Sequence, residues 1–120
     1  MSEKNMMIRM RMIFTDDEKK RISIQQARDG GGLTTVVTAD VHGMNCRQAK
    51  AFIRNVIALF RGSFKLVVIH GFHSGTALRD MIRTEAATFS RKVNADSVHG
   101  WYWNDGVTEM RVSALCAAGT

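Results

Sequence analysis

The chain has 120 residues, with 17 Lys and Arg against 11 Asp and Glu, so its formal net charge is +6 when the histidines are neutral. This length predicts one domain, and 45% hydrophobic with 23% charged residues is typical of a globular protein, which argues against intrinsic disorder and fibrous repeats. No apolar run is long enough to span a bilayer and no signal-peptide core is present, so we expect a cytoplasmic protein with no membrane partner. Cys46 and Cys116 are too few for a disulfide scaffold, and we expect two reduced thiols.

The N-terminal segment predicts a strand, a helix and a linker. Residues 6–14 alternate apolar and polar side chains with the two-residue period of a half-buried edge strand. Thr15 and Glu18 form a capping-box pattern that predicts a short helix over residues 15–28. The consecutive glycines 30–32 predict a flexible linker.

These features divide the chain into an N-terminal extension (residues 1–32), a compact domain (33–116) and a frayed tail (117–120). The strand in the extension either pairs within its own sheet or exchanges with a neighbouring copy. A homodimer or a larger protein complex therefore stays open.

The compact domain begins with a strand and an amphipathic helix. Residues 33–41 are rich in β-branched side chains and predict a strand. A helix follows from the N-cap Asn45 to about residue 61, and Gly62 stands where a left-handed C-cap is favoured. Five apolar residues form the core-facing stripe of this helix: Ala49, Phe52, Ile53, Val56 and Phe60.

The second half of the domain predicts strand, helix, strand and strand. Residues 65–69 form a buried strand, and a second helix begins near Thr76, with core positions at Leu78, Met81 and Ile82. A β-hairpin follows, with strands at 98–103 and 107–115 and a turn at 104–106. We expect Trp101 and Trp103 in the core; the alternative is that an exposed ring of the aromatic run 101–103 stacks on a base. The order β-α-β-α-β-β predicts an α/β fold with helices packed on a mixed sheet.

Two early strands end in the same way, in Asp40-Val41-His42-Gly43 and in Ile69-His70-Gly71. Ligands of open α/β sheets bind outside the carboxyl ends of the strands, so Asp40, His42 and His70 are expected close together. A carboxylate can orient one imidazole and a second imidazole can supply a proton, which suits general acid–base cleavage of a phosphodiester. The alternative is that both histidines only cap their strand ends.

The loop from Gly71 to Gly75 runs into the second helix, where backbone amides can bind an anion. The residues expected around a phosphate group are Gly43, Gly71, His73, Ser74, Gly75, Thr76, Arg79 and Arg83. The first helix adds Arg47, Lys50 and Arg54, which form a solvated face or follow a phosphate backbone. Asp40, His42, His70 and His73 offer a second alternative, a divalent metal site such as zinc. His99 is expected to be structural or exposed to solvent.

The two strand-end motifs, each before a helix, resemble those of the Smr (small MutS-related) domain. The resemblance covers about residues 34–115 and rests on Asp40, His42 and Gly43, then on His70, Gly71 and Gly75, with Leu78 and Arg79 as the following step. It implies an α/β sandwich similar to the C-terminal domain of translation initiation factor three. It also implies binding of DNA or RNA and, in several members, endonuclease activity.

The chain departs from the family pattern at three places. Ala39 replaces the usual leucine, His73 replaces the middle glycine, and the step from Gly75 to Leu78 is one residue longer. His73 either obstructs a backbone phosphate or supplies a new acid. Three functions follow as hypotheses: a nucleic-acid-binding endonuclease, a binding module that recruits DNA or RNA without cleaving it, and a metal-dependent phosphoesterase for a small substrate.

Overall fold

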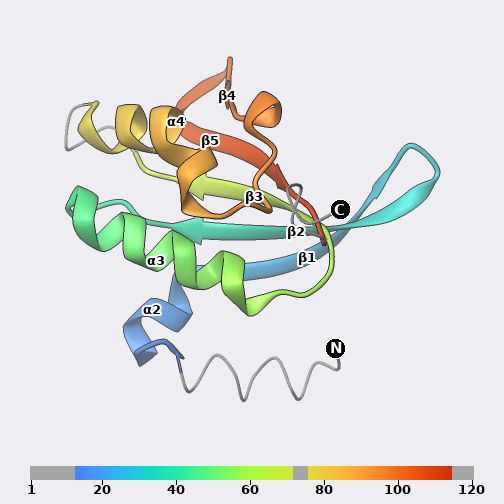
Figure 1. Cartoon of the computed structure of the whole chain (residues 1–120), viewed down its shortest axis with the longest axis horizontal. Coiled ribbons are helices and arrows are strands. Elements are labelled where there is room, and N and C mark those ends of the chain that lie inside the picture. The colour runs from blue at the N-terminus through green and yellow to red at the C-terminus, as the bar shows by residue number, and fades with distance from the viewer. Residues whose placement is uncertain (1–12, 72–75, 115–120) are drawn as a thin grey trace.

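A mixed sheet with the strand order β1-β2-β3-β5-β4 organises the chain (Figure 1). The computed structural model describes residues 13–71 and 76–114. The strands in these residues are β1 (Ile22–Asp29), β2 (Gly32–Asp40), β3 (Phe64–Ile69), β4 (His99–Trp101) and β5 (Asn104–Val112). The helices are α2 (Asp16–Lys20), α3 (Cys46–Leu59), α4 (Ala77–Phe89) and the 3-10 turn η1 (Ala95–Ser97). The predicted α/β class is confirmed.

The parallel pair β2 and β3 positions the two strand-end motifs. Helix α3 connects these strands, and its capping box between Asn45 and Gln48 fixes where the helix begins. Asp40 is in register with Ile69, so both strands end at the same edge of the sheet. We call this the reactive edge; it comprises residues 40–43 and 69–71.

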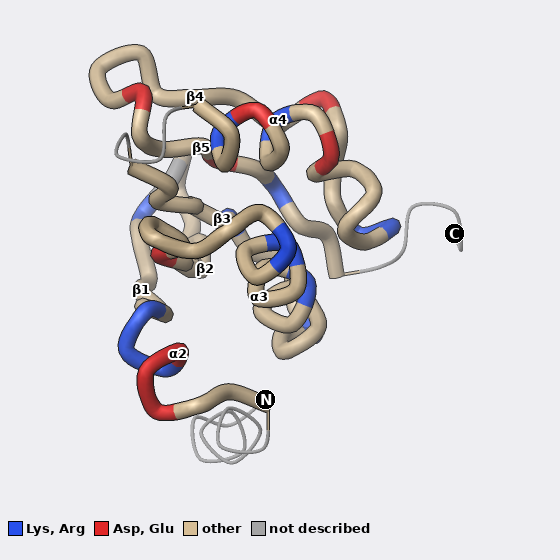
Figure 2. The backbone as a smooth tube through the Cα atoms, turned by 90° about the vertical axis from the view of Figure 1, so that its left-hand side faces the viewer, with Lys and Arg blue, Asp and Glu red and all other residues tan. Residues whose placement is uncertain are grey.

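Helices α3 and α4 cover one face of the sheet, as Figures 1 and 2 show. The core lies between these layers, and the five residues predicted for the apolar stripe of α3 are all buried. Phe14, which precedes α2, packs edge to face on Phe52 with ring centroids 5.5 Å apart. Burial of this aromatic ring holds the short helix α2 against the domain.

The opposite side of the sheet is covered by neither α3 nor α4 (Figure 2). Its residues follow from the strand register, because paired residues point to the same side and alternate along each strand. We call this side the open face, and its central residues are Val36, Thr38, Asp40, Lys65, Val67, Ile69, Val107, Glu109 and Arg111.

The helix predicted over residues 15–28 is wrong beyond Lys20. The chain forms β1 instead, which pairs antiparallel with β2 along its full length. Gly30 and Gly31, with φ of 60° and 100°, form the tight turn of this hairpin, so the expected linker joins two strands of one sheet. The predicted capping box is confirmed. Beyond it, pairing with β2 is favoured over a longer helix, because the segment has few apolar residues on one helical face.

Three further expectations need correction. Gly62 is not a left-handed cap, because α3 ends at Leu59 and Phe60 is already extended. The C-terminal hairpin turns at residues 102–103 instead of 104–106. Trp103 lies outside the core with 68% of its surface exposed, and Trp101 is only partly buried.

The edge strand expected at residues 6–14 falls largely outside the described residues, as do the tail at 117–120 and the loop residues His73, Ser74 and Gly75. Within the described ranges, every helix is too short or too polar to cross a lipid bilayer.

Candidate functional site

The reactive edge brings the two histidine motifs side by side. The backbone N–H of Val41 donates to the carbonyl of Ile69 at 2.8 Å, which continues the parallel ladder one residue past β2. A Cβ atom added to Gly71 would lie 3.4 Å from the Cβ of His42. The expected proximity of the strand ends is therefore confirmed by the backbone.

Asp40 and His42 form a directly bonded pair. The Oδ1 atom of Asp40 accepts a hydrogen bond from the backbone N–H of His42 at 3.1 Å, and the same atom contacts Nδ1 of the His42 ring. Because a carboxylate only accepts, Nδ1 carries a proton, and in the neutral ring the lone pair is therefore on Nε2. The His42 side chain is 57% exposed, so this pair combines an oriented imidazole with access to solvent.

Arg21, the C-cap residue of α2, supports this pair. Its Nη1 donates to the carbonyl oxygens of Asp40 at 3.2 Å and His42 at 2.9 Å. Its Nε lies 3.5 Å from a carboxylate oxygen of Asp17, so α2 in turn positions the guanidinium. Sequence reasoning missed Arg21 because it assigned this residue to the interior of a helix.

Both glycines of the histidine motifs have the left-handed conformation. Gly43 has φ of 82° and Gly71 has φ of 71°. Met44 N–H donates to the Val41 carbonyl at 3.0 Å, which closes a turn with Gly43 in the third position, where a type II turn requires positive φ. The repeated His-Gly step therefore has a conformational cause, since other residues are strained there.

His70 occupies a different environment from His42, with only 2% of its surface exposed. Its Nε2 lies 2.9 Å from Oγ1 of Thr108, and that oxygen accepts from Nε of Arg83 at 2.9 Å. Burial lowers the pKa of the His70 imidazole; the hydrogen bond to the Gly71 carbonyl raises it and the charge of Arg83 lowers it further. A neutral ring with the proton on Nδ1 satisfies all of these partners.

Arg79 and Arg83, expected to bind phosphate, both meet the carboxylate of Asp105. This contact holds the pKa of Asp105 below its usual value. Arg83 also donates to the Val107 carbonyl at 3.3 Å, and its guanidinium group lies where a Cβ at Gly100 would stand. These two arginines therefore attach α4 to the C-terminal hairpin in the structure.

The basic residues predicted on α3 divide into two groups. Lys50 pairs with Glu85 of α4 at 2.9 Å, and Arg54 donates to the Phe89 carbonyl at 3.5 Å, so both connect the helices. Arg47 is exposed near the start of α3 and forms no ion pair with any of the described residues. Thr76 precedes α4 without a side-chain capping bond.

Two shallow clefts adjoin the turn at Gly43 and Met44. One, of about 460 Å³, lies between α2 and α3 and includes Arg21. The other, of about 390 Å³, includes Cys46 and the start of α4 at Ala77. Both clefts include Gly43, the residue that follows His42.

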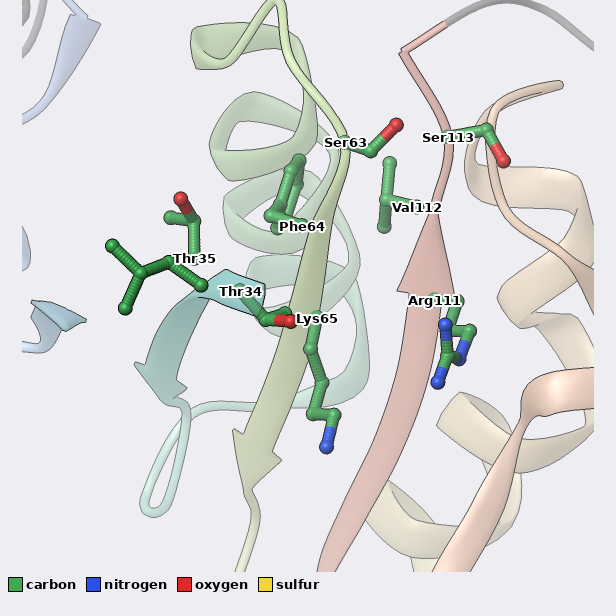
Figure 3. Close-up of a pocket in the computed structure, with 9 residues that line it drawn as sticks. Thr34, Thr35, Ser63, Phe64, Lys65, Arg111, Val112 and Ser113 are labelled. Carbon is green, nitrogen blue, oxygen red and sulfur yellow. The ribbon is translucent and has the colours of Figure 1, made fainter. Parts of the chain in front are cut away.

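A further cavity lies at the opposite end of the sheet. It has a volume of about 350 Å³, and Figure 3 shows Lys65 and Arg111 lying along neighbouring strands at its border. It contains none of the predicted catalytic residues.

Metal binding was an alternative for the histidine cluster. Asp40 and His42 are adjacent, but within residues 13–71 and 76–114 no group of three or more His, Cys, Asp or Glu side chains is arranged to hold a metal ion. His73, the remaining candidate ligand, is outside these ranges.

His99 is exposed, as expected, but it has an acidic neighbour that the sequence did not indicate. Its Nε2 lies 3.7 Å from Glu109 on the adjacent strand.

Comparison with known proteins gave no match to a family model, to a curated protein or to a solved structure.

Proposed function

We propose that this protein is a nucleic-acid-binding endonuclease of the Smr type, with the Asp40–His42 pair as its proton-transfer group. The observation that carries the proposal is the oriented, solvent-accessible imidazole at the end of a parallel strand pair. The net charge of +6 supports a polyanionic substrate. The paired histidine-glycine motifs and their resemblance to the Smr domain narrow that substrate to DNA or RNA.

In this mechanism Nε2 of His42 takes the proton from the attacking hydroxyl, which is water or a ribose 2′-OH. The attacking oxygen forms a bond to phosphorus and the bond to the leaving oxygen breaks. The leaving oxygen then takes a proton from the imidazolium or from solvent. Asp40 keeps the ring in the required tautomer and stabilises its positive charge during the transfer.

His70 has a positioning role in this proposal. Its buried, neutral ring bonds to Thr108 and so fixes the end of β3 against β5. The adjacent Gly71 approaches His42 and has a left-handed backbone conformation. His70 therefore acts by holding the backbone of the reactive edge in place.

Phosphate binding falls first to Arg47, because its charge is not neutralised by a described neighbour. Arg21 adds a positive charge next to the His42 turn. Arg79 and Arg83 can contribute only if a phosphate competes with Asp105 for them. Binding is therefore expected to weaken steeply with salt.

A recruitment module that binds nucleic acid without cleaving it is the second candidate. One observation favours it: His70, the expected second proton carrier, is buried and bonded within the protein. In that case the reactive edge serves only as a binding surface.

Cleavage of supercoiled plasmid and of structured RNA, with and without EDTA, distinguishes these candidates. We expect cleavage by the wild type and its loss in His42→Ala. His99→Ala is the matched control, because that histidine is 58% exposed and also faces a carboxylate. Salt-sensitive binding with no cleavage, even by the wild type, would favour the recruitment module. If the wild type cleaves without EDTA and not in its presence, the reaction depends on a metal ion.

A further inference from the structure

Three consecutive aromatic residues, Trp101 at the end of β4 and Tyr102 and Trp103 in the turn before β5, form what we call the aromatic loop. The indole rings of Trp101 and Trp103 are stacked, with centroids 5.2 Å apart and planes 27° apart. Tyr102 meets Trp103 edge to face at 5.2 Å. Tyr102 is 96% exposed and Trp103 is 68% exposed, so the stack ends in rings that contact solvent.

This aromatic loop is fixed in place by polar bonds. Nε1 of Trp101 donates to Glu109 at 2.8 Å, and Glu109 also meets Lys65 at 3.5 Å. Further along the loop, Asn104 accepts from Gly106 N–H at 3.0 Å. The stack is therefore preorganised, which lowers the entropic cost of binding a flat ligand.

The aromatic loop is placed beside both the open face and the reactive edge. Glu109, the anchor of Trp101, belongs to the open face. The carbonyl of Gly106 accepts from the backbone N–H groups of His70 at 2.9 Å and Gly71 at 3.0 Å. Figure 2 shows the loop extending beyond the sheet at its upper edge, away from α3. A strand held at the reactive edge can therefore reach the aromatic rings.

The charges of the open face match a nucleic-acid strand. Lys65 and Arg111 stand opposite one another on β3 and β5. The negative charge of Glu109 is already met by Lys65 and lies near His99. Because Lys65 is paired with Glu109, the cation left for a phosphate is the exposed Arg111, which forms no ion pair with a described residue. A cation beside flat rings is the combination that single-stranded nucleic acids require.

We infer that Trp103, stacked on Trp101, is a base-stacking site that selects unpaired nucleotides, so that the substrate is single-stranded or contains single-stranded segments. Bases within a duplex have both faces covered by their neighbours and cannot stack on an indole. The inference rests on the proposed function, because it identifies the form of nucleic acid presented to His42.

Binding of a 15-nucleotide single strand and of a blunt duplex of the same sequence tests this site. Trp103→Ala should weaken binding of the single strand about tenfold and change binding of the duplex less than twofold. Ile24→Ala is the matched control, since Ile24 is 40% exposed but lies on β1, at the other edge of the sheet from β4. In the wild type, the single strand should quench tryptophan fluorescence.

Trp103→Phe keeps a flat ring and should bind the single strand almost as tightly as the wild type does. This result would show that Trp103→Ala weakens binding through the loss of stacking and not through a loss of folding. Equal weakening of both ligands, or no weakening, would overturn the stacking site while cleavage dependent on His42 could still stand. Absence of binding to either ligand by the wild type at low salt would overturn the proposed function as well. If the wild type is a dimer and Trp103→Ala is a monomer that binds the single strand equally well, the aromatic loop is a contact between copies. This result would also overturn the inference.

Discussion

One carboxylate oxygen of Asp40 contacts both the backbone N–H and the ring Nδ1 of His42. The two residues are separated by one position, so the turn that ends β2 also orients the imidazole. The pair needs no distant element to form, but Arg21 holds the turn by bonding to the carbonyl oxygens of both residues. Local backbone geometry thus produces an imidazole with its Nε2 directed away from the carboxylate.

Asp40→Asn should slow cleavage about 10²-fold, within the range that general acid–base catalysis contributes, while leaving nucleic-acid binding unchanged. The amide can still accept from the His42 backbone N–H, but it lacks the charge that stabilises the imidazolium. Single-turnover rates and gel-shift affinities measure these two effects separately. Equal rates in the variant and the wild type would show that the carboxylate does not assist His42.

Arg21→Ala should lower the free energy of unfolding by about 2 kcal/mol and reduce cleavage, because two carbonyl oxygens lose a charged donor. Arg28→Ala is the control, since Arg28 is an exposed arginine of β1, the strand that follows Arg21. Urea unfolding provides the stability measurement. If both variants lose the same stability, Arg21 does not support the reactive edge.

The stability of the fold should depend on pH through His70. Its pKa is lower in the folded protein than its ordinary value of 6.5, so the unfolded chain binds more protons as the pH falls below that value. The free energy of unfolding therefore decreases from about pH 6.5 downward until the folded-state pKa is passed. His70→Gln should show a weaker decrease over this range in urea unfolding at several pH values. If the free energy of unfolding depends on pH in the same way in both proteins, His70 is not the source of this dependence.

Gly43→Ala should destabilise the protein by about 1 kcal/mol or more, because φ is 82° and no atom within 4 Å obstructs a Cβ. The cost is then purely that of the backbone conformation. Gly62→Ala is a close control, since its surroundings are equally open and its φ is not positive. Thermal unfolding of both variants measures the difference, and similar losses would show that the left-handed turn is not what the glycine provides.

The sequence predicted the reactive edge because its signals are local. The β-branched run before Asp40, the apolar stripe of α3 and the matched histidine-glycine steps each determine structure within a few residues. The parallel pairing of β2 and β3 follows from the helix between them.

The sequence could not reveal the partners that come from distant segments. Arg21 reaches the reactive edge only because residues 22–29 form a strand, and that choice depends on pairing with β2. The burial of His70 depends on Thr108 and Arg83, which are separated from it by more than ten positions. Trp103 was assigned to the core from alternation, but the turn at 102–103 removes it from the alternating pattern.

The single-turnover cleavage rate of His42→Ala, with and without added imidazole, shows whether the His42 ring transfers the proton. If it does, the variant's rate is about 10²- to 10⁴-fold below that of the wild type and recovers in part as imidazole is added, whereas His99→Ala cleaves at the wild-type rate. Cleavage by His42→Ala at the wild-type rate would contradict this role of His42.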